Sequence, residues 1–228
     1  MELWSAIFVS DDSDWATCSV SPYRWREVTD ENPQAQRIIA HVEVGGKSIY
    51  IPLGAPMPHD SHNSLFLPNW AISNLGIDGT GEVATVTWMS QEAFPSATRI
   101  VLRPHDSAFH SVDAKEELEI ALTRLGVLRC GDTLLIPIGG LGGYEIAFDV
   151  VVTEPANIVL AEGDEVAMEF EEALDAPSAP LEPEEFEAEP FEEDGMIETP
   201  PALNGHVLGG EPTRRMPDGR AWNPYRVA

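Results

Sequence analysis

The chain has 228 residues, of which 43% are hydrophobic, and its formal net charge is -26. A chain of this length has room for a compact unit of two small subdomains followed by a tail. The acidic charge disfavours binding to nucleic acid and to anionic lipid surfaces, because like charges repel. No apolar run approaches the ~20 residues of a membrane-spanning helix, so we expect no membrane insertion.

The two cysteines, Cys18 and Cys130, are too few for a disulfide framework or a zinc knuckle. Residues 1–4 are acidic and do not have the basic start and apolar run of a signal peptide. We therefore expect a protein of a reducing compartment. The cytoplasm is the predicted location, with the nucleus left open as a second one.

Residues 1–37 show no clear periodicity, and we expect strands or irregular structure there. Residues 38–52 predict a hairpin, because two β-rich apolar runs flank Gly45-Gly46. Both residues of such a two-residue turn need a positive φ, which glycine adopts readily.

The central feature is the stretch 65–76, in which an apolar strand end runs through Pro68 into a short helical turn. Proline is tolerated at a first helical position, since its missing N–H would lack a partner there anyway. Gly76 can adopt the left-handed conformation that ends such a turn. We expect Trp70 and Leu75 to plug the end of a sheet or barrel.

Further strands are expected at 82–88 and 99–103, with a subdomain boundary at 90–96. Asp113 and Glu116 predict a capping box for a helix over 113–125. Its buried stripe follows helical spacing, with apolar residues at Leu118, Ala121, Leu122 and Leu125.

Four more strands are predicted after this helix, at 133–138, 144–152, 158–160 and 166–170. The glycine run 139–143 lies between two of them, so we interpret it as a hairpin loop. A phosphate cradle would need a following helix or a nearby cation.

The tail divides into two parts of different composition. Residues 171–201 are rich in Glu, Pro and Ala, a composition that predicts disorder. The last 25 residues are Gly-rich and then basic, with four arginines around Trp222: Arg214, Arg215, Arg220 and Arg226.

The loop His59-Asp60-Ser61-His62 is the candidate for metal chemistry, although a metal site needs further ligands. No triad, Cys-His pair or carboxylate pair stands out, which favours binding over catalysis. We therefore predict no catalytic residue, metal or cofactor. Two alternatives stay open: a metal-dependent enzyme on a β-barrel using His59 and His62, and an acidic module that binds basic proteins.

The segment Leu67-Pro68-Asn69-Trp70, followed by Asn74-Leu75, resembles the Leu-Pro-x-Trp…Asn-Leu segment of the ubiquitin fusion degradation protein family. The resemblance continues in the same order over roughly residues 40–174, at Ala97-Thr98, Pro104, Phe109, Glu117-Leu118, Ala121-Leu122, Leu128, Gly131-Asp132, Tyr144-Glu145, Glu154-Pro155, Val166 and Phe170.

This resemblance implies a mainly β, α+β protein: a double-psi β-barrel over 1–95, an α+β subdomain over 96–174, and a disordered acidic tail over 175–228. It makes Pro68, Trp70, Leu75, Gly131 and Asp132 structural anchors.

The resemblance also implies a function as a non-enzymatic adaptor in ubiquitin-dependent, proteasomal and ER-associated degradation. Its partners would be ubiquitin or polyubiquitin chains, the nuclear protein localisation co-adaptor and a hexameric AAA+ unfoldase, the valosin-containing protein. In the family, tail segments of the form Phe-x-Gly-x-Gly-x-x-Leu dock on the unfoldase. Here Gly205, Leu208 and Gly209 lie in a partial match to that pattern.

Overall fold

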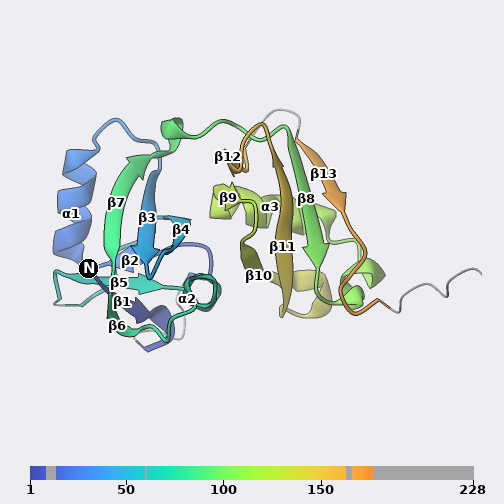
Figure 1. The fold of residues 1–228 in the computed structure, drawn as a ribbon, viewed down its shortest axis with the longest axis horizontal. Helices are drawn as coiled ribbons and strands as arrows, with labels where there is room; N and C mark the ends of the chain where they lie inside the picture. The colour runs from blue at the N-terminus through green and yellow to red at the C-terminus, as the bar shows by residue number, and fades with distance from the viewer. Residues whose placement is uncertain (9–13, 60, 163–165, 177–228) are drawn as a thin grey trace, which may run out of the picture. The chain divides into compact units, whose positions relative to one another are not determined.

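The computed structural model describes residues 1–8, 14–59, 61–162 and 166–176. These residues belong to one compact unit, which extends from Met1 to Ala179. The described part is a mixed α+β fold of thirteen strands and three α-helices (Figure 1). The predicted disorder of the acidic tail concerns residues that, beyond Ala176, lie outside the described ones. No helix in the described ranges is long and apolar enough to cross a membrane.

The strands that precede Ser96 form two sheets. One has the order β2 (Ser19–Val20), β5 (Ser64–Leu67), β1 (Glu2–Ser5), β6 (Thr80–Val83), and the other has the order β4 (Lys47–Pro52), β3 (Ile38–Val44), β7 (Thr85–Ser90). β1 and β5 are parallel, and the other neighbours are antiparallel. Within the described ranges no sheet closes on itself, so no barrel is present there as a continuous ladder.

The hairpin predicted for residues 38–52 is confirmed. β3 and β4 pair in antiparallel register, with Val44 opposite Lys47. Gly45 and Gly46 form the turn between them with φ values of 58° and 81°. Two successive positive φ values match the right-handed twist of the strands, which is why this turn needs glycine.

The prediction of strands or irregular structure for residues 1–37 is wrong in one respect, because helix α1 spans Pro22–Glu31. Ser21 is its N-cap and accepts a hydrogen bond from the Arg24 N–H, and Pro22 follows at the first helical position. Serine before proline is a helix-start signal. The strands β1 and β2 agree with the expectation.

The single strand predicted at 82–88 is also wrong, because two strands occupy this stretch. β6 pairs with β1, whereas β7 pairs with β3 of the other sheet. Ala84 lies between them, and its N–H donates to the Met1 carbonyl at 2.8 Å. The alternating pattern continues through the break, so it could not reveal that the chain changes sheets.

The predicted proline–tryptophan turn is confirmed as helix α2 (Asn69–Leu75). Pro68 is its N-cap rather than its first helical residue, and Gly76 ends it with φ 66° and ψ 40°. Trp70 and Leu75 are buried, with exposed fractions of 5% and 2%. The helix packs against both β4 and β10.

The strands from Arg99 onwards form a second group, with no ladder to those before Ser90 among the described residues. One sheet has the order β10 (Thr133–Ile138), β11 (Tyr144–Glu154), β8 (Arg99–Pro104), β13 (Ala167–Phe170), and a short ladder joins β12 (Ile158–Leu160) to β9 (Val127–Arg129). The predicted strands are confirmed, and the glycine run 139–143 links β10 to β11 as a hairpin loop. β9 was not predicted. The division at residue 95 stays a prediction.

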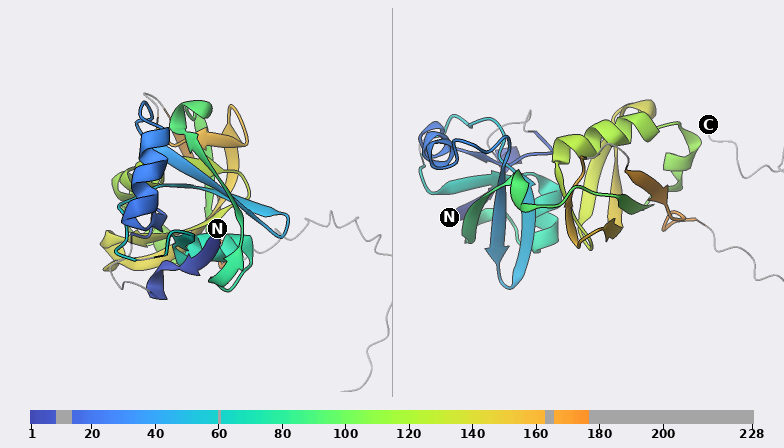
Figure 2. Two further views of the ribbon diagram at one scale, coloured as in Figure 1. Left: turned by 90° about the vertical axis from the view of Figure 1, so that its left-hand side faces the viewer. Right: turned by 90° about the horizontal axis from the view of Figure 1, so that it is seen from above.

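Helix α3 (Lys115–Leu125) lies across this sheet and buries the predicted apolar stripe (Figure 2). The predicted capping box is wrong, because the N-cap is Ala114 and no side chain caps the helix. The Glu117 carboxylate instead accepts hydrogen bonds from the N–H groups of Gly139, at 2.8 Å, and Gly140, at 3.3 Å. The first turn of α3 therefore fastens the glycine-rich hairpin loop.

Short 3₁₀ turns connect several of these elements: η1 (Ala6–Phe8), η2 (Gln91–Ala93), η3 (Ser107–Ser111) and η4 (Gly139–Leu141).

The edge strand β13 runs parallel to β8 and is held by ion pairs as well as by backbone hydrogen bonds. The Arg99 guanidinium contacts the Glu169 carboxylate at 2.8 Å, and Arg103 pairs with Glu171. Beyond β13, the Asp175 carboxylate accepts hydrogen bonds from Ser107, at 2.7 Å from its N–H and 3.1 Å from its hydroxyl. The described chain thus stays attached to the body at the start of the predicted tail.

One cluster of buried side chains includes residues from both strand groups. It joins Leu3, Ile49 and Trp70 to Leu118 and Phe148. The two groups therefore share a hydrophobic core.

Replacing Trp70 with alanine is predicted to lower the free energy of unfolding by about 3–5 kcal/mol, because it removes a buried aromatic side chain and leaves a cavity. Urea denaturation of both proteins measures this change. Ile120→Ala is the control, since Ile120 is 71% exposed on α3. A loss for Trp70→Ala no larger than for the control would show that Trp70 does not plug the core.

Candidate functional site

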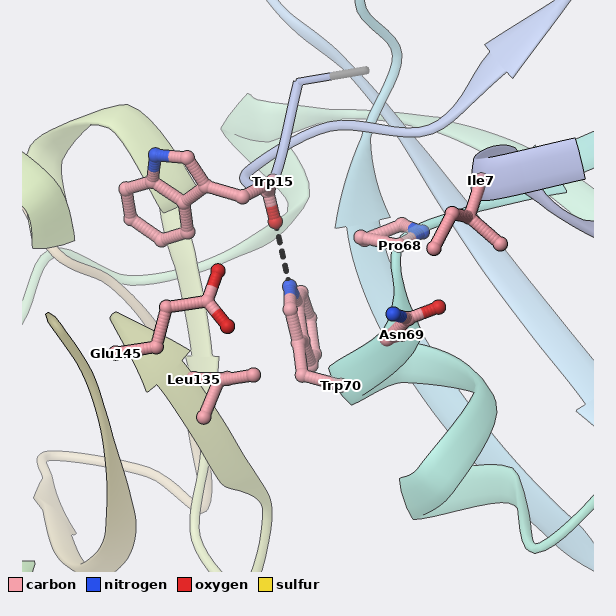
Figure 3. A pocket seen from close by; sticks show the side chains of 7 residues that line it. All are labelled: Ile7, Trp15, Pro68, Asn69, Trp70, Leu135 and Glu145. Carbon is pink, nitrogen blue, oxygen red and sulfur yellow. Dashed lines mark hydrogen bonds between the residues drawn. The ribbon is translucent and has the colours of Figure 1, made fainter. Parts of the chain in front are cut away.

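Two adjoining cavities lie where α2 meets β10 and β11, and we call them together the junction groove. The smaller cavity has a volume of about 190 Å³ and is lined by Ile7, Trp15, Pro68, Asn69, Trp70, Leu135 and Glu145 (Figure 3). The larger has a volume of about 370 Å³ and is lined by Asn69, Trp70, Ser73, Asn74, His105, Thr133, Leu134, Leu135 and Ala147. Asn69, Trp70 and Leu135 belong to both.

Trp70 forms the wall that the two cavities share. Its Nε1–H donates a hydrogen bond to the Trp15 carbonyl at 2.6 Å, which provides the partner that a buried indole N–H requires. Next to it, the Asn69 side-chain oxygen accepts a hydrogen bond from the Ser5 hydroxyl at 2.9 Å. The start of α2 is thereby tied to β1 and to the segment around Trp15.

Asn74 ties the other end of α2 to strand β10. Its Nδ2 donates to the Thr133 carbonyl at 2.7 Å and to the Trp70 carbonyl at 2.8 Å, and its Oδ1 accepts from the Thr133 N–H at 2.9 Å. The side chain thus pairs with Thr133 as a neighbouring strand would. β10 is the edge strand of its sheet, and unpaired backbone groups at an edge require partners.

A small polar cluster lies at the far side of the larger cavity. Thr133 donates a hydrogen bond to Asp149 Oδ1 at 2.7 Å, and His105 Nε2 lies 2.9 Å from the same oxygen. Partial burial acts to raise the pKa of Asp149, but the Thr133 hydroxyl, His105 and the nearby Arg103 outweigh it and lower the pKa below its ordinary value.

The predicted anchors Gly131 and Asp132 lie in the turn between β9 and β10. Asp132 is buried, and its carboxylate accepts a hydrogen bond from Arg129 Nε at 2.9 Å. Burial raises the pKa of Asp132, while the Arg129 guanidinium acts in the opposite direction. Arg129 also donates to the Ser48 hydroxyl at 2.8 Å, which links this turn to β4. Their role as structural anchors stays a prediction.

The two histidines of the candidate metal loop have separate aromatic neighbours. The His59 ring lies 5.1 Å from that of Phe66, and the His62 ring lies 4.7 Å from that of Tyr23. Within the part of the chain that the structure describes, which excludes Asp60, no group of three or more metal-ligating side chains is present.

The two cysteines differ in environment. Cys18 is buried, and burial raises the pKa of its thiol to about 12, which keeps it protonated at neutral pH. Cys130 is exposed, and its sulfur lies 3.0 Å from the Val151 carbonyl oxygen. The docking residues predicted in the tail, Gly205, Leu208 and Gly209, lie outside the described residues.

Sequence reasoning placed Trp70 in the core but did not identify the groove beside it. Trp15 and Glu145 both line the groove. Trp15 precedes Trp70 by 55 residues, and Glu145 lies far beyond Trp70 in the sequence. Neither belongs to a local motif whose spacing could indicate the other. Of these two residues, only Trp15 carries a sequence signal for a binding surface, because tryptophan is enriched at such surfaces.

No protein-family model matches the sequence, and no similar sequence was found among curated proteins.

Asn74→Ala is predicted to destabilise the protein by about 1–3 kcal/mol, because the backbone N–H and C=O of Thr133 lose their partner. Hydrogen exchange of the Thr133 amide should accelerate more than that of amides in β3 and β4. Ser73→Ala is the control, since Ser73 is exposed on the same helix. Equal protection of Thr133 in Asn74→Ala and wild type would contradict the bridging role.

The Asp149 cluster predicts a pH-dependent contribution to stability. Because the folded-state pKa of Asp149 lies below its ordinary value of 3.8, its contribution is present above that value and is lost as the pH falls through the folded-state pKa. The difference in free energy of unfolding between wild type and Asp149→Asn should therefore be constant above about pH 5 and shrink in acid. Urea titrations at several pH values measure it, and a constant difference throughout would refute the prediction.

Proposed function

We propose that this protein is a non-enzymatic adaptor of ubiquitin-dependent protein degradation, as its resemblance to the ubiquitin fusion degradation protein family implies. In this proposal the folded body binds ubiquitin chains and the nuclear protein localisation co-adaptor. The tail binds a hexameric AAA+ unfoldase, with Gly205, Leu208 and Gly209 as its docking residues. The proposal includes a double-psi β-barrel over 1–95 and an α+β subdomain over 96–174.

The observation that carries this proposal is the contact between the Leu-Pro-x-Trp…Asn-Leu segment and the residue that directly follows the Gly131-Asp132 pair. Trp70 and Asn74 belong to the Leu-Pro-x-Trp…Asn-Leu segment, and Thr133 directly follows the Gly131-Asp132 pair. The Asn74 side chain bonds both backbone groups of Thr133 across 59 residues of sequence. These two parts of the resemblance therefore border one junction of the fold, which supports reading them as parts of one pattern.

The strand order of the first half supports the barrel. β1 and β5 pair in parallel although β2, β3 and β4 lie between them in the sequence. A parallel pair cannot be joined by a simple hairpin turn, so the chain must interleave other strands before it returns. Such a parallel pairing between separated strands supports the proposed barrel, although the sheets of the described residues do not close on themselves.

An adaptor needs at least two binding regions rather than one strong site. If the body holds ubiquitin weakly and the tail holds the unfoldase, the tether raises the local concentration of substrate at the unfoldase. Weak individual contacts are sufficient in such an arrangement, because both engage the same assembly.

The test is a titration of tetraubiquitin into the isotope-labelled full-length chain, followed by NMR. We expect saturable shifts in the body with a micromolar dissociation constant, and weaker binding of monoubiquitin because it offers a single copy of the surface. The absence of any shift at high micromolar tetraubiquitin would contradict the proposal.

A second measurement tests the tail. Purified hexameric AAA+ unfoldase should bind the full chain, and Leu208→Ala should weaken that binding without changing the affinity for tetraubiquitin. Val207→Ala is the matched control, since it removes apolar bulk at the neighbouring position. Equal unfoldase binding by wild type and Leu208→Ala would show that the predicted docking residues are wrong.

A further inference from the structure

The smaller cavity of the junction groove has an unusual combination of walls. Two indoles, those of Trp15 and Trp70, lie near one carboxylate, that of Glu145 (Figure 3). The Glu145 side chain reaches from β11 toward the space beside them. None of the seven lining residues is cationic.

The chemistry of these walls favours a cation. A carboxylate only accepts hydrogen bonds, and the face of an indole attracts positive charge. Glu145 takes part in none of the ion pairs of the described ranges, so its carboxylate is free to pair with a ligand. An anionic ligand would meet repulsion from Glu145 and from the acidic charge of the whole chain.

The size of the cavity indicates one long side chain. Its volume of about 190 Å³ lies below the ~300–1,000 Å³ of pockets that enclose a drug-sized ligand. The larger cavity next to it offers the apolar surfaces of Trp70, Leu134 and Ala147. A ligand that used both would carry an apolar side chain close to its cationic one.

The protein itself already places a guanidinium on one of these indoles. The Arg124 guanidinium carbon lies 5.9 Å from the centre of the Trp15 ring, and Asp14 holds this arginine through a contact of 3.1 Å. Arg124 does not line the cavity. A guanidinium over the Trp15 ring and beside a carboxylate is thus an arrangement that this protein already contains, outside the cavity.

We propose that the smaller cavity binds an arginine side chain of a partner protein, with the guanidinium against the indoles and paired with the Glu145 carboxylate. An apolar residue close to that arginine occupies the larger cavity. Arginine suits the site better than lysine, because its planar guanidinium both stacks on aromatic rings and bonds a carboxylate through two N–H groups. The inference rests on the proposed function in one respect, that the ligand is a segment of a protein.

The site is held in place before any ligand arrives. The Trp70 indole is fixed by its bond to the Trp15 carbonyl, and Asn69 by its bond to Ser5. Less ordering is then required on binding, which favours affinity from a small contact area.

The test uses the full-length chain and N-acetyl-arginine methylamide as the probe, monitored by NMR. We expect saturable shifts of the Trp15 and Trp70 indole N–H signals with a millimolar dissociation constant. The indole of Trp25, which donates to the Gly54 carbonyl and lines neither cavity, is the internal reference. Shifts that do not saturate, or that are equal at Trp25, would overturn the proposal.

Two chemical controls isolate the charge. The corresponding citrulline derivative has nearly the shape of arginine but is neutral, and it should bind at least about fivefold more weakly. The lysine derivative should fall between the two. Equal binding of arginine and citrulline derivatives would overturn the proposal.

Protein variants complete the test. Glu145→Gln keeps the size of the side chain and should weaken arginine binding at least about fivefold. Glu116→Gln makes the same charge change at an exposed position of α3 and should have no effect. An unchanged affinity in Glu145→Gln would overturn the arginine site.

Titration of tetraubiquitin into the same samples separates this inference from the proposed function. If the wild-type chain binds tetraubiquitin but not the arginine probe, the arginine site alone is refuted. Arginine binding without ubiquitin binding supports the site and refutes the adaptor function.

Discussion

The side-chain amide of Asn74 occupies the place of a strand at the edge of β10. Its three hydrogen bonds connect the end of α2 with the first residue of β10. Trp70 lies one helical turn earlier and accepts one of these bonds at its carbonyl, and its indole lines the groove together with Leu135. Both cavities of the junction groove depend on that arrangement, because each is lined by α2 on one side and by β10 on the other.

The charged groups of the folded body determine the electrostatic environment of this groove. Most of its cations are already paired with carboxylates, among them Arg37 with Glu162 at 3.0 Å and Arg129 with Asp132. The excess acidic charge of the chain is therefore available to solvent and to partners. Glu145 adds a directed contact to this general field, because it lies beside two indoles. A long-range field increases the association rate, whereas such a directed contact gives specificity.

Much of the fold could be predicted because local signals agreed with the tertiary structure. The Gly45-Gly46 turn, the Pro68–Gly76 helix and the buried stripe of α3 each follow from a few neighbouring residues. Two of the errors arose where tertiary contacts overrode a local pattern, whereas helix α1 was missed although Ser21 before Pro22 is a local start signal. Glu117 bonds the glycine loop while no side chain caps α3, and the alternating run after Thr80 divides between two sheets.

The candidate site could not be predicted from local sequence patterns. Trp15, Trp70 and Glu145 come from a loop, a helix and a strand that are far apart in sequence, and only the folded arrangement brings them together. None of these three residues belongs to a local sequence pattern that predicts the other two. The groove depends on long-range contacts that residue spacing does not encode.

The attachment of β13 has a mechanical consequence. Any tension applied to the chain beyond Ala176 reaches the body through the Asp175–Ser107 bonds and then through β13. That strand lies at a sheet edge, where its ion pairs with Arg99 and Arg103 are exposed to salt. A pulling force would therefore separate this strand from β8 before it disturbed the core around α2. The force needed to separate it would vary with ionic strength.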